Sequence, residues 1–191
     1  MGLKEELLAE RRASYARLSG GFPIPLAGAV YWGALGYAGS FLPLKSWIVV
    51  AFWGSGAIFP LALLFAAIFR NGFMKDRTAV DTLLAPAFIG MLLFWPMAAA
   101  ALQVAPELTP LILAIGMSMH WPAIGWMYGR PQLYSAHSIV RAALATAIWF
   151  VYPEERLTWL PYSVAAVYLV TVIAIVIDSA GVRARLAKAA A

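Results

Sequence analysis

The chain contains no cysteine. This absence excludes disulfide bonds, thiolate zinc sites, iron–sulfur clusters and cysteine nucleophiles. Charged side chains are also scarce, at 12% of the 191 residues, whereas soluble domains carry about 25%. Hydrophobic residues make up 63% of the chain, and its mean hydropathy is +0.79. Because so little polar surface is left to face water, the composition predicts an integral membrane protein with no separate soluble domain.

Long apolar runs take the place of the missing polar residues. A transmembrane helix needs about 20 mostly apolar residues to cross a hydrocarbon core of about 30 Å. Lipid offers the backbone no hydrogen-bond partner, and no alternating barrel pattern is visible, so we expect an all-α bundle of six transmembrane helices. The expected spans are Phe22–Phe41, Ser46–Phe69, Leu83–Gln103, Leu108–Gly129, His137–Tyr152 and Leu157–Ile177.

The basic residues between these runs fall mainly on one side. Only Lys45 and Arg156 fall on the other side. The positive-inside rule then predicts both termini in the cytoplasm and a location in the cytoplasmic (inner) membrane. The net charge of +5 is explained by anionic lipid headgroups rather than by nucleic acid. The twelve residues on the basic side are Lys4, Arg11, Arg12, Arg17, Arg70, Lys75, Arg77, Arg130, Arg141, Arg183, Arg185 and Lys188.

The two ends of the chain are expected to lie outside the spans. Residues 1–20 lack the apolar core of a signal peptide, and they predict a short amphipathic cytoplasmic helix on the membrane surface; a partly frayed helix is the alternative. Gly20 and Gly21 would end this helix. Residues 21–180 form the predicted six-helix transmembrane domain, and residues 181–191 form a basic cytoplasmic tail, with Gly181 ending the last helix.

Three of the expected spans contain an aromatic residue followed by proline near the middle. The pairs are Phe59-Pro60, Trp95-Pro96 and Trp121-Pro122. Proline removes a backbone hydrogen bond and kinks a helix. Three kinks at a similar depth could separate the helices around a cavity at the bilayer midplane, but ordinary packing of kinked helices is the favoured reading.

His120 is the ionisable residue that lies deepest in the expected spans. Such residues are costly in a membrane and are by default candidates for function; a neutral histidine that joins two helices is the simpler reading. A metal site is not expected, because the other histidine, His137, lies at the rim of a span. The candidate residues for binding a ligand are His120, Ser118, Trp121, Trp95, Phe59 and Trp53.

A second polar group is expected at the cytoplasmic boundary. Its members are Arg70, Asp81, Arg130, His137 and Arg141. Arg141 would lie about one turn inside its span, where it could pair with Asp81 or Asp178. The group is a candidate site for an anion or a lipid headgroup, and a ring that anchors the bundle is the simpler alternative.

Three function classes remain open. The first is a protein that binds or transports a small apolar or amphipathic molecule in an intramembrane cavity. The second is an enzyme acting on a lipid, with either His120 or the group Asp81, His137 and Arg141 as acid, base and anion holder. It is less favoured because too few polar groups lie at one depth. The third is a structural or accessory subunit; Gly125 and Gly129 permit close helix contact within the bundle or in a homo-oligomer. No cofactor is expected.

Two stretches carry a resemblance. They are Gly56-Ala57-Ile58-Phe59-Pro60, and His120-Trp121-Pro122 followed by Trp126-Met127-Tyr128-Gly129. They resemble motifs of an uncharacterised family of small bacterial multi-pass membrane proteins. The resemblance implies a bacterial cytoplasmic membrane location and no particular activity. It also implies that His120 and the tyrosine–glycine end of the fourth span belong to one recurrent element.

Overall fold

The computed structural model describes residues 2–190, and all regular structure in this range is helical, as predicted. Four short 3₁₀ turns, η1 to η4, join some of the helices. The helices are α1 (Leu3–Arg17), α2 (Pro23–Gly39), α3 (Leu44–Ser55), α4 (Ile58–Ile68), α5 (Leu84–Leu92), α6 (Trp95–Val104), α7 (Thr109–Gly116), α8 (Trp121–Met127), α9 (Pro131–Val151) and α10 (Trp159–Ala190).

The three aromatic–proline pairs lie directly after breaks in the helices. α3 and α4 meet at a bend of 49° that precedes Phe59 and Pro60. α6 and α8 begin at Trp95 and Trp121, with proline in the first turn of each. Proline is tolerated in the first turn because its missing N–H has no intrahelical partner there. The kinks predicted from the sequence are therefore present as three broken helix pairs.

Three helical segments are long and apolar enough to cross a membrane. They are Asp81–Val104, Pro106–Met127 and Trp159–Ala189, and the bent pair α3–α4 makes a fourth if it counts as one span. α2 has 17 residues, at the short end of what a crossing needs. Length and composition thus give three or four candidate spans in the described residues, not a clear six.

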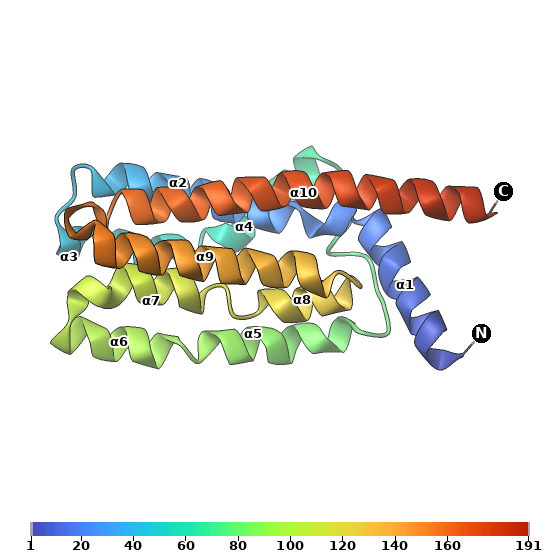
Figure 1. The fold of residues 1–191 in the computed structure, drawn as a ribbon, viewed down its shortest axis with the longest axis horizontal. Helices are drawn as coiled ribbons and strands as arrows, with labels where there is room; N and C mark the ends of the chain where they lie inside the picture. Colours follow the sequence, from blue (N-terminus) through green and yellow to red (C-terminus); the bar gives the residue numbers. More distant parts are fainter. Residues whose placement is uncertain (1, 191) are drawn as a thin grey trace.

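Most of the helices run along the long axis of the molecule, and α1 crosses them at one end (Figure 1). α10 packs most extensively against α2 and α9; α9 in turn contacts α7 and α8, and α2 contacts α3 and α4. Phe52 of α3 meets Trp95 of α6 with ring centroids 4.9 Å apart. Trp32, Trp47 and Leu113 are among the large side chains that fill the core.

One end of the bundle is covered by α1, beside the C-terminal end of α10 (Figure 1). Arg183 of α10 donates to the carbonyl of Ala16 at 2.7 Å. The guanidinium of Arg130 lies 5.2 Å from the ring of Tyr15, and Asn71, next to Arg70, donates to the carbonyl of Leu18. The basic segments before α2, after α4 and after α8 therefore gather at one end, as the charge distribution predicts.

Two expectations about helix ends need correction, and the alternative of a frayed N-terminal helix is ruled out. α10 continues through Gly181 to Ala190, because this glycine does not have the positive φ that ends many helices. α1 is a continuous helix held against the bundle, not a frayed one. α9 begins at Pro131 rather than at His137, so Arg141 lies about 15 Å along the helix, given a rise of 1.5 Å per residue.

Candidate functional site

A cavity of about 480 Å³ lies between the helices of the bundle, next to the C-terminal end of α1. Its walls come from α2, α4, α5 and α8, and Tyr134 of α9 and Tyr168 of α10 also line it. Residues 73–78 and the end of α1 border the same space. The bend between α3 and α4 contributes Ser55 and Ile58, and the break before α8 contributes Met117 and His120. Two of the three helix breaks thus contribute residues to the cavity wall.

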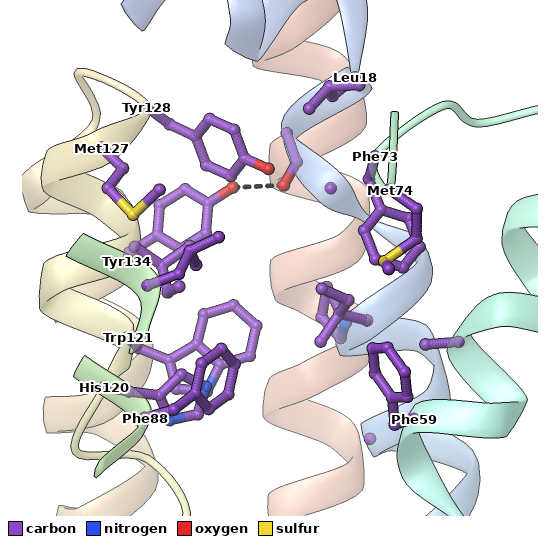
Figure 2. Close-up of a pocket in the computed structure, with 18 of the residues that line it drawn as sticks. Leu18, Phe59, Phe73, Met74, Phe88, His120, Trp121, Met127, Tyr128 and Tyr134 are labelled. Atoms are coloured by element: carbon purple, nitrogen blue, oxygen red, sulfur yellow. Dashed lines mark hydrogen bonds between the residues drawn. The ribbon is translucent and has the colours of Figure 1, made fainter. Parts of the chain in front are cut away.

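The cavity wall is mainly apolar and aromatic (Figure 2). Phe59 of α4 and Phe88 of α5 lie on opposite sides of it. Both residues are also partly exposed, Phe59 by 53% and Phe88 by 38%. Neither side chain is enclosed by the protein, although both line the cavity.

His120 lies in the wall and is 9% exposed. Its ring stacks on Phe88, with centroids 4.9 Å apart, and lies 5.6 Å from the ring of Trp121. Its Nδ1 has no hydrogen-bond partner in the described part of the chain. A buried polar atom without a partner is costly, so a ligand group or water that reached this nitrogen would relieve that cost.

Trp121 is the centre of an aromatic cluster behind His120. Its ring lies 5.7 Å from Tyr134, 4.6 Å from His137 and 5.8 Å from Tyr168. Its indole Nε1 is buried and has no partner among residues 2–190. Trp121 and Tyr168 line the cavity, whereas His137 lies behind them.

A hydrogen bond to the backbone closes the upper part of the cavity. The hydroxyl of Tyr134 donates to the carbonyl of Gly20 at 2.6 Å (Figure 2). Gly20 has φ +63°, and a Cβ there would come within 2.7 Å of the Tyr15 ring. Only glycine adopts this conformation without strain in so little space, which explains why a glycine is needed between α1 and α2.

The segment after α4 is hydrogen-bonded to α1 at the end of the cavity nearest α1. Asp76 accepts from the Ser14 hydroxyl at 2.6 Å and forms an ion pair with Arg17 at 2.9 Å. Glu10 accepts from the N–H of Ala79 at 2.9 Å. Because Ser14 and Asp76 both border the cavity, these bonds form a cap over it. We call residues 71–81 together with α1 the cap.

Arg11 joins α1 to the end of α8. Its Nη2 donates to the carbonyl of Trp126, and its guanidinium carbon lies 4.1 Å from the centre of the Trp126 ring. Burial and the neighbouring charge of Arg12 lower the pKa of Arg11. The cap is therefore attached to α8 through Arg11 and to α10 through Arg183.

The six residues predicted to bind a ligand are only partly brought together. Phe59, His120 and Trp121 line the cavity. Ser118 is buried beside it, and its hydroxyl donates to the Ile115 carbonyl. Trp95 instead packs on Phe52 and Phe94. Trp53 is 84% exposed on the outer surface and faces no cavity.

The five residues predicted at the boundary are dispersed. Arg70 is exposed, and Arg130 pairs with Asp178 at 2.5 Å. Asp81 lines the cavity, but its carboxylate accepts from the N–H and hydroxyl of Thr78. Arg141 thus pairs with neither of the carboxylates considered from the sequence.

His137 and Arg141 lie inside the bundle instead of at its rim, because α9 begins earlier than expected. His137 is 3% exposed and Arg141 is 0% exposed. None of the hydrogen bonds of Asp81 reaches either residue. The three side chains proposed for acid–base catalysis are therefore not hydrogen-bonded to one another in the described structure, and no group of three or more His, Asp or Glu side chains in it could hold a metal ion.

The sequence reasoning did not select the tyrosines of the cavity. Tyr128, Tyr134 and Tyr168 all line it. Thr171, one turn after Tyr168, binds His137 through its hydroxyl at 2.8 Å. Tyr168, Thr171 and Asp178 are the polar residues within the apolar stretch 164–178 of α10, and they were the signal that could have identified this helix as part of the site.

The fold and the cavity define an all-helical protein with several apolar spans and an aromatic-lined internal cavity. The chain belongs to the family of unknown function DUF7010, which matches residues 7–178. Membership of an uncharacterised family is thereby confirmed, while the bacterial and membrane location implied by the resemblance is not tested by the match. No curated protein and no solved structure was found that matches the chain.

Proposed function

We propose that this protein crosses a membrane six times and binds a small apolar or amphipathic molecule in its cavity. Each expected span corresponds to one helix or one broken pair: α2, α3–α4, α5–α6, α7–α8, α9 and α10. Both termini are assigned to the cytoplasm, because the basic residues gather at the end covered by α1.

The outer surface supports immersion in lipid. Large apolar side chains are exposed on every one of these six units, whereas soluble proteins rarely expose contiguous apolar surface of this extent. Examples, one from each unit in chain order, are Val30 (47% exposed), Leu64 (53%), Leu93 (68%), Met119 (55%), Ile139 (67%) and Val170 (67%).

The cavity is the single observation that carries the binding function. Its volume of about 480 Å³ falls within the range of about 300–1,000 Å³ typical of small-molecule sites. Such sites combine apolar walls with a few polar groups that orient the ligand. Here the walls are aromatic and aliphatic, and His120 Nδ1 and Trp121 Nε1 are polar atoms without partners in the described structure.

The position of Phe59 and Phe88 suggests a route into the cavity. Both side chains line the cavity and remain partly exposed, so we place the entrance between α4 and α5. A molecule dissolved in the bilayer would enter through this side without passing the cap. This route favours a ligand that partitions into lipid over a hydrophilic solute.

The direct test is native mass spectrometry of the purified protein with the molecules that copurify with it. We expect one amphipathic or apolar molecule per chain to survive removal of the detergent. A mass spectrum of the bare chain under conditions that preserve known lipid complexes would contradict the proposal. Multiple loosely bound lipids with no preferred stoichiometry would point instead to surface adhesion.

A further inference from the structure

Arg141 has the least exposed charged side chain among residues 2–190, at 0%. Its Nη1 donates to the Tyr168 hydroxyl at 2.7 Å. Its guanidinium carbon lies 5.0 Å from the ring centres of both Trp32 and Tyr168. Its Nε and Nη2 have no hydrogen-bond partner in the described structure. The charge is therefore only partly compensated.

The two free nitrogens lie on one edge of the planar guanidinium group. Their N–H bonds are parallel, and this geometry matches the two oxygens of a carboxylate or phosphate. Arginine does not lose its proton in proteins, so Arg141 cannot escape the cost of burial by becoming neutral. A buried charge without a counter-charge is strongly unfavourable.

No carboxylate of the described chain supplies that counter-charge. The ion pairs within residues 2–190 are Arg17–Asp76 and Arg130–Asp178, both near α1. The nearest polar contacts of Arg141 are instead neutral and aromatic. A negative group that does not belong to the described chain could accept hydrogen bonds from Nε and Nη2 of Arg141.

Arg141 does not itself line the cavity, and Tyr168 lies between the two. Other polar atoms surround Arg141. The Thr171 hydroxyl donates to the Val167 carbonyl, so its oxygen accepts from His137 Nδ1–H at 2.8 Å. His137 Nε2 is then a free acceptor, and it has no partner in the described structure. Tyr168 joins this cluster to the cavity, because its ring lines the cavity while its hydroxyl binds Arg141.

We propose that the Nε–Nη2 edge of Arg141 binds the paired oxygens of an anionic group, and that the ligand of the cavity is an amphiphile that carries this group. The apolar part of the ligand occupies the space beside Phe59, Phe88 and Trp121. Tyr168 lies at the boundary between the two parts. This inference rests on the proposed function, because the amphiphile occupies the same cavity.

Dodecanoate and dodecanol are matched probes for this site, since they differ mainly in the anionic group. Each would be titrated into the 191-residue chain in detergent and its retention measured by native mass spectrometry. We expect the wild-type chain to bind dodecanoate at least about tenfold more tightly than dodecanol. In Arg141→Met this preference should vanish, with dodecanol binding unchanged.

A second variant keeps the test decisive if Arg141→Met does not fold. Arg141→Lys retains the charge but lacks the two-nitrogen edge, so we expect an intermediate preference. Equal binding of dodecanoate and dodecanol to the wild type would overturn the inference. The inference would also be overturned if Arg141→Met kept the wild-type preference for dodecanoate over dodecanol. If only Arg141→Lys folds, the same result in that variant would overturn it.

Inorganic phosphate, added alone and in competition, distinguishes the source of the anion. If phosphate binds and displaces dodecanoate, the Arg141 edge holds a free oxyanion; if it does neither, the anion is carried by the amphiphile. The failure of the proposed function gives a different result. In that case neither dodecanoate nor dodecanol binds, whereas failure of this inference alone leaves both bound equally.

Discussion

The ring of Tyr168 lies directly against Gly28, so that a Cβ on residue 28 would come within 2.7 Å of it. This contact holds α10 close to α2 at the back of the cavity, where the Tyr168 hydroxyl meets Arg141. We expect Gly28→Ala to displace Tyr168 and to lower the free energy of unfolding by about 1–3 kcal/mol, as overpacking commonly does.

Gly33 provides the matched control on the same helix. A Cβ there would meet no atom within 4 Å, so Gly33→Ala should leave stability unchanged or slightly higher. Thermal unfolding of both variants in the same detergent measures the difference. Equal melting temperatures would show that the contact between Gly28 and Tyr168 does not determine how closely the two helices approach.

The ion pair between Arg130 and Asp178 joins the turn before α9 to α10. The two atoms, Nε and Oδ2, are 2.5 Å apart, and the side chains are 19% and 35% exposed. Because solvent still reaches both side chains, we expect Asp178→Asn to lower the free energy of unfolding by about 1–2 kcal/mol. This loss lies between those of exposed and buried ion pairs. A double-mutant cycle with Arg130→Gln measures the coupling. Strictly additive losses would mean that the pair contributes nothing.

The cap should open when Asp76 loses its charge. Asp76→Asn weakens the bonds to Ser14 and Arg17, and Arg17 is half exposed, so a loss of about 1 kcal/mol is expected. Hydrogen–deuterium exchange should then become faster in residues 71–81 and in α1, but not in α9. Glu154→Gln, at the other end of the bundle, is the control. Unchanged exchange in the cap would show that Asp76 does not hold it closed.

The absence of cysteine makes the topology simple to test. Lys45→Cys and Lys75→Cys would each introduce a single thiol, one on either side of the membrane according to the charge distribution. In intact cells, an impermeant maleimide should label residue 45 but not residue 75. Labelling of both positions, or of residue 75 alone, would contradict the assigned orientation.

The helical segments could be predicted from the sequence because each depends on a local run of apolar residues. The breaks at Pro60, Pro96 and Pro122 were predictable for the same reason, since proline acts on its own backbone. The start of α9 was missed: Pro131 opens it, but the polar residues Gln132 and Ser135 hid the helix from a search for apolar runs. The depth of His137 and Arg141 was consequently misjudged.

The cavity itself was predictable only in part. Phe59, His120 and Trp121 were selected because they lie beside prolines or deep in a span, and these are local signals. Trp53 and Trp95 carried the same signals but face away from the cavity. Which face of a helix turns inward depends on the order of helices around the bundle. For that reason Tyr168, on the last helix, could not be placed beside Trp121 on the fourth span.

The central claim is that the cavity holds an apolar or amphipathic molecule, and filling the cavity tests it most directly. Met117 lines the cavity, whereas Met97 is 57% exposed on the outer face of α6. The same change to tryptophan at each position adds the same volume inside the cavity or outside it. Native mass spectrometry would measure the bound molecule per chain in both variants, after each has been shown to elute as a single folded species. We predict that Met117→Trp loses the molecule and Met97→Trp retains it; equal retention in both variants would contradict the account.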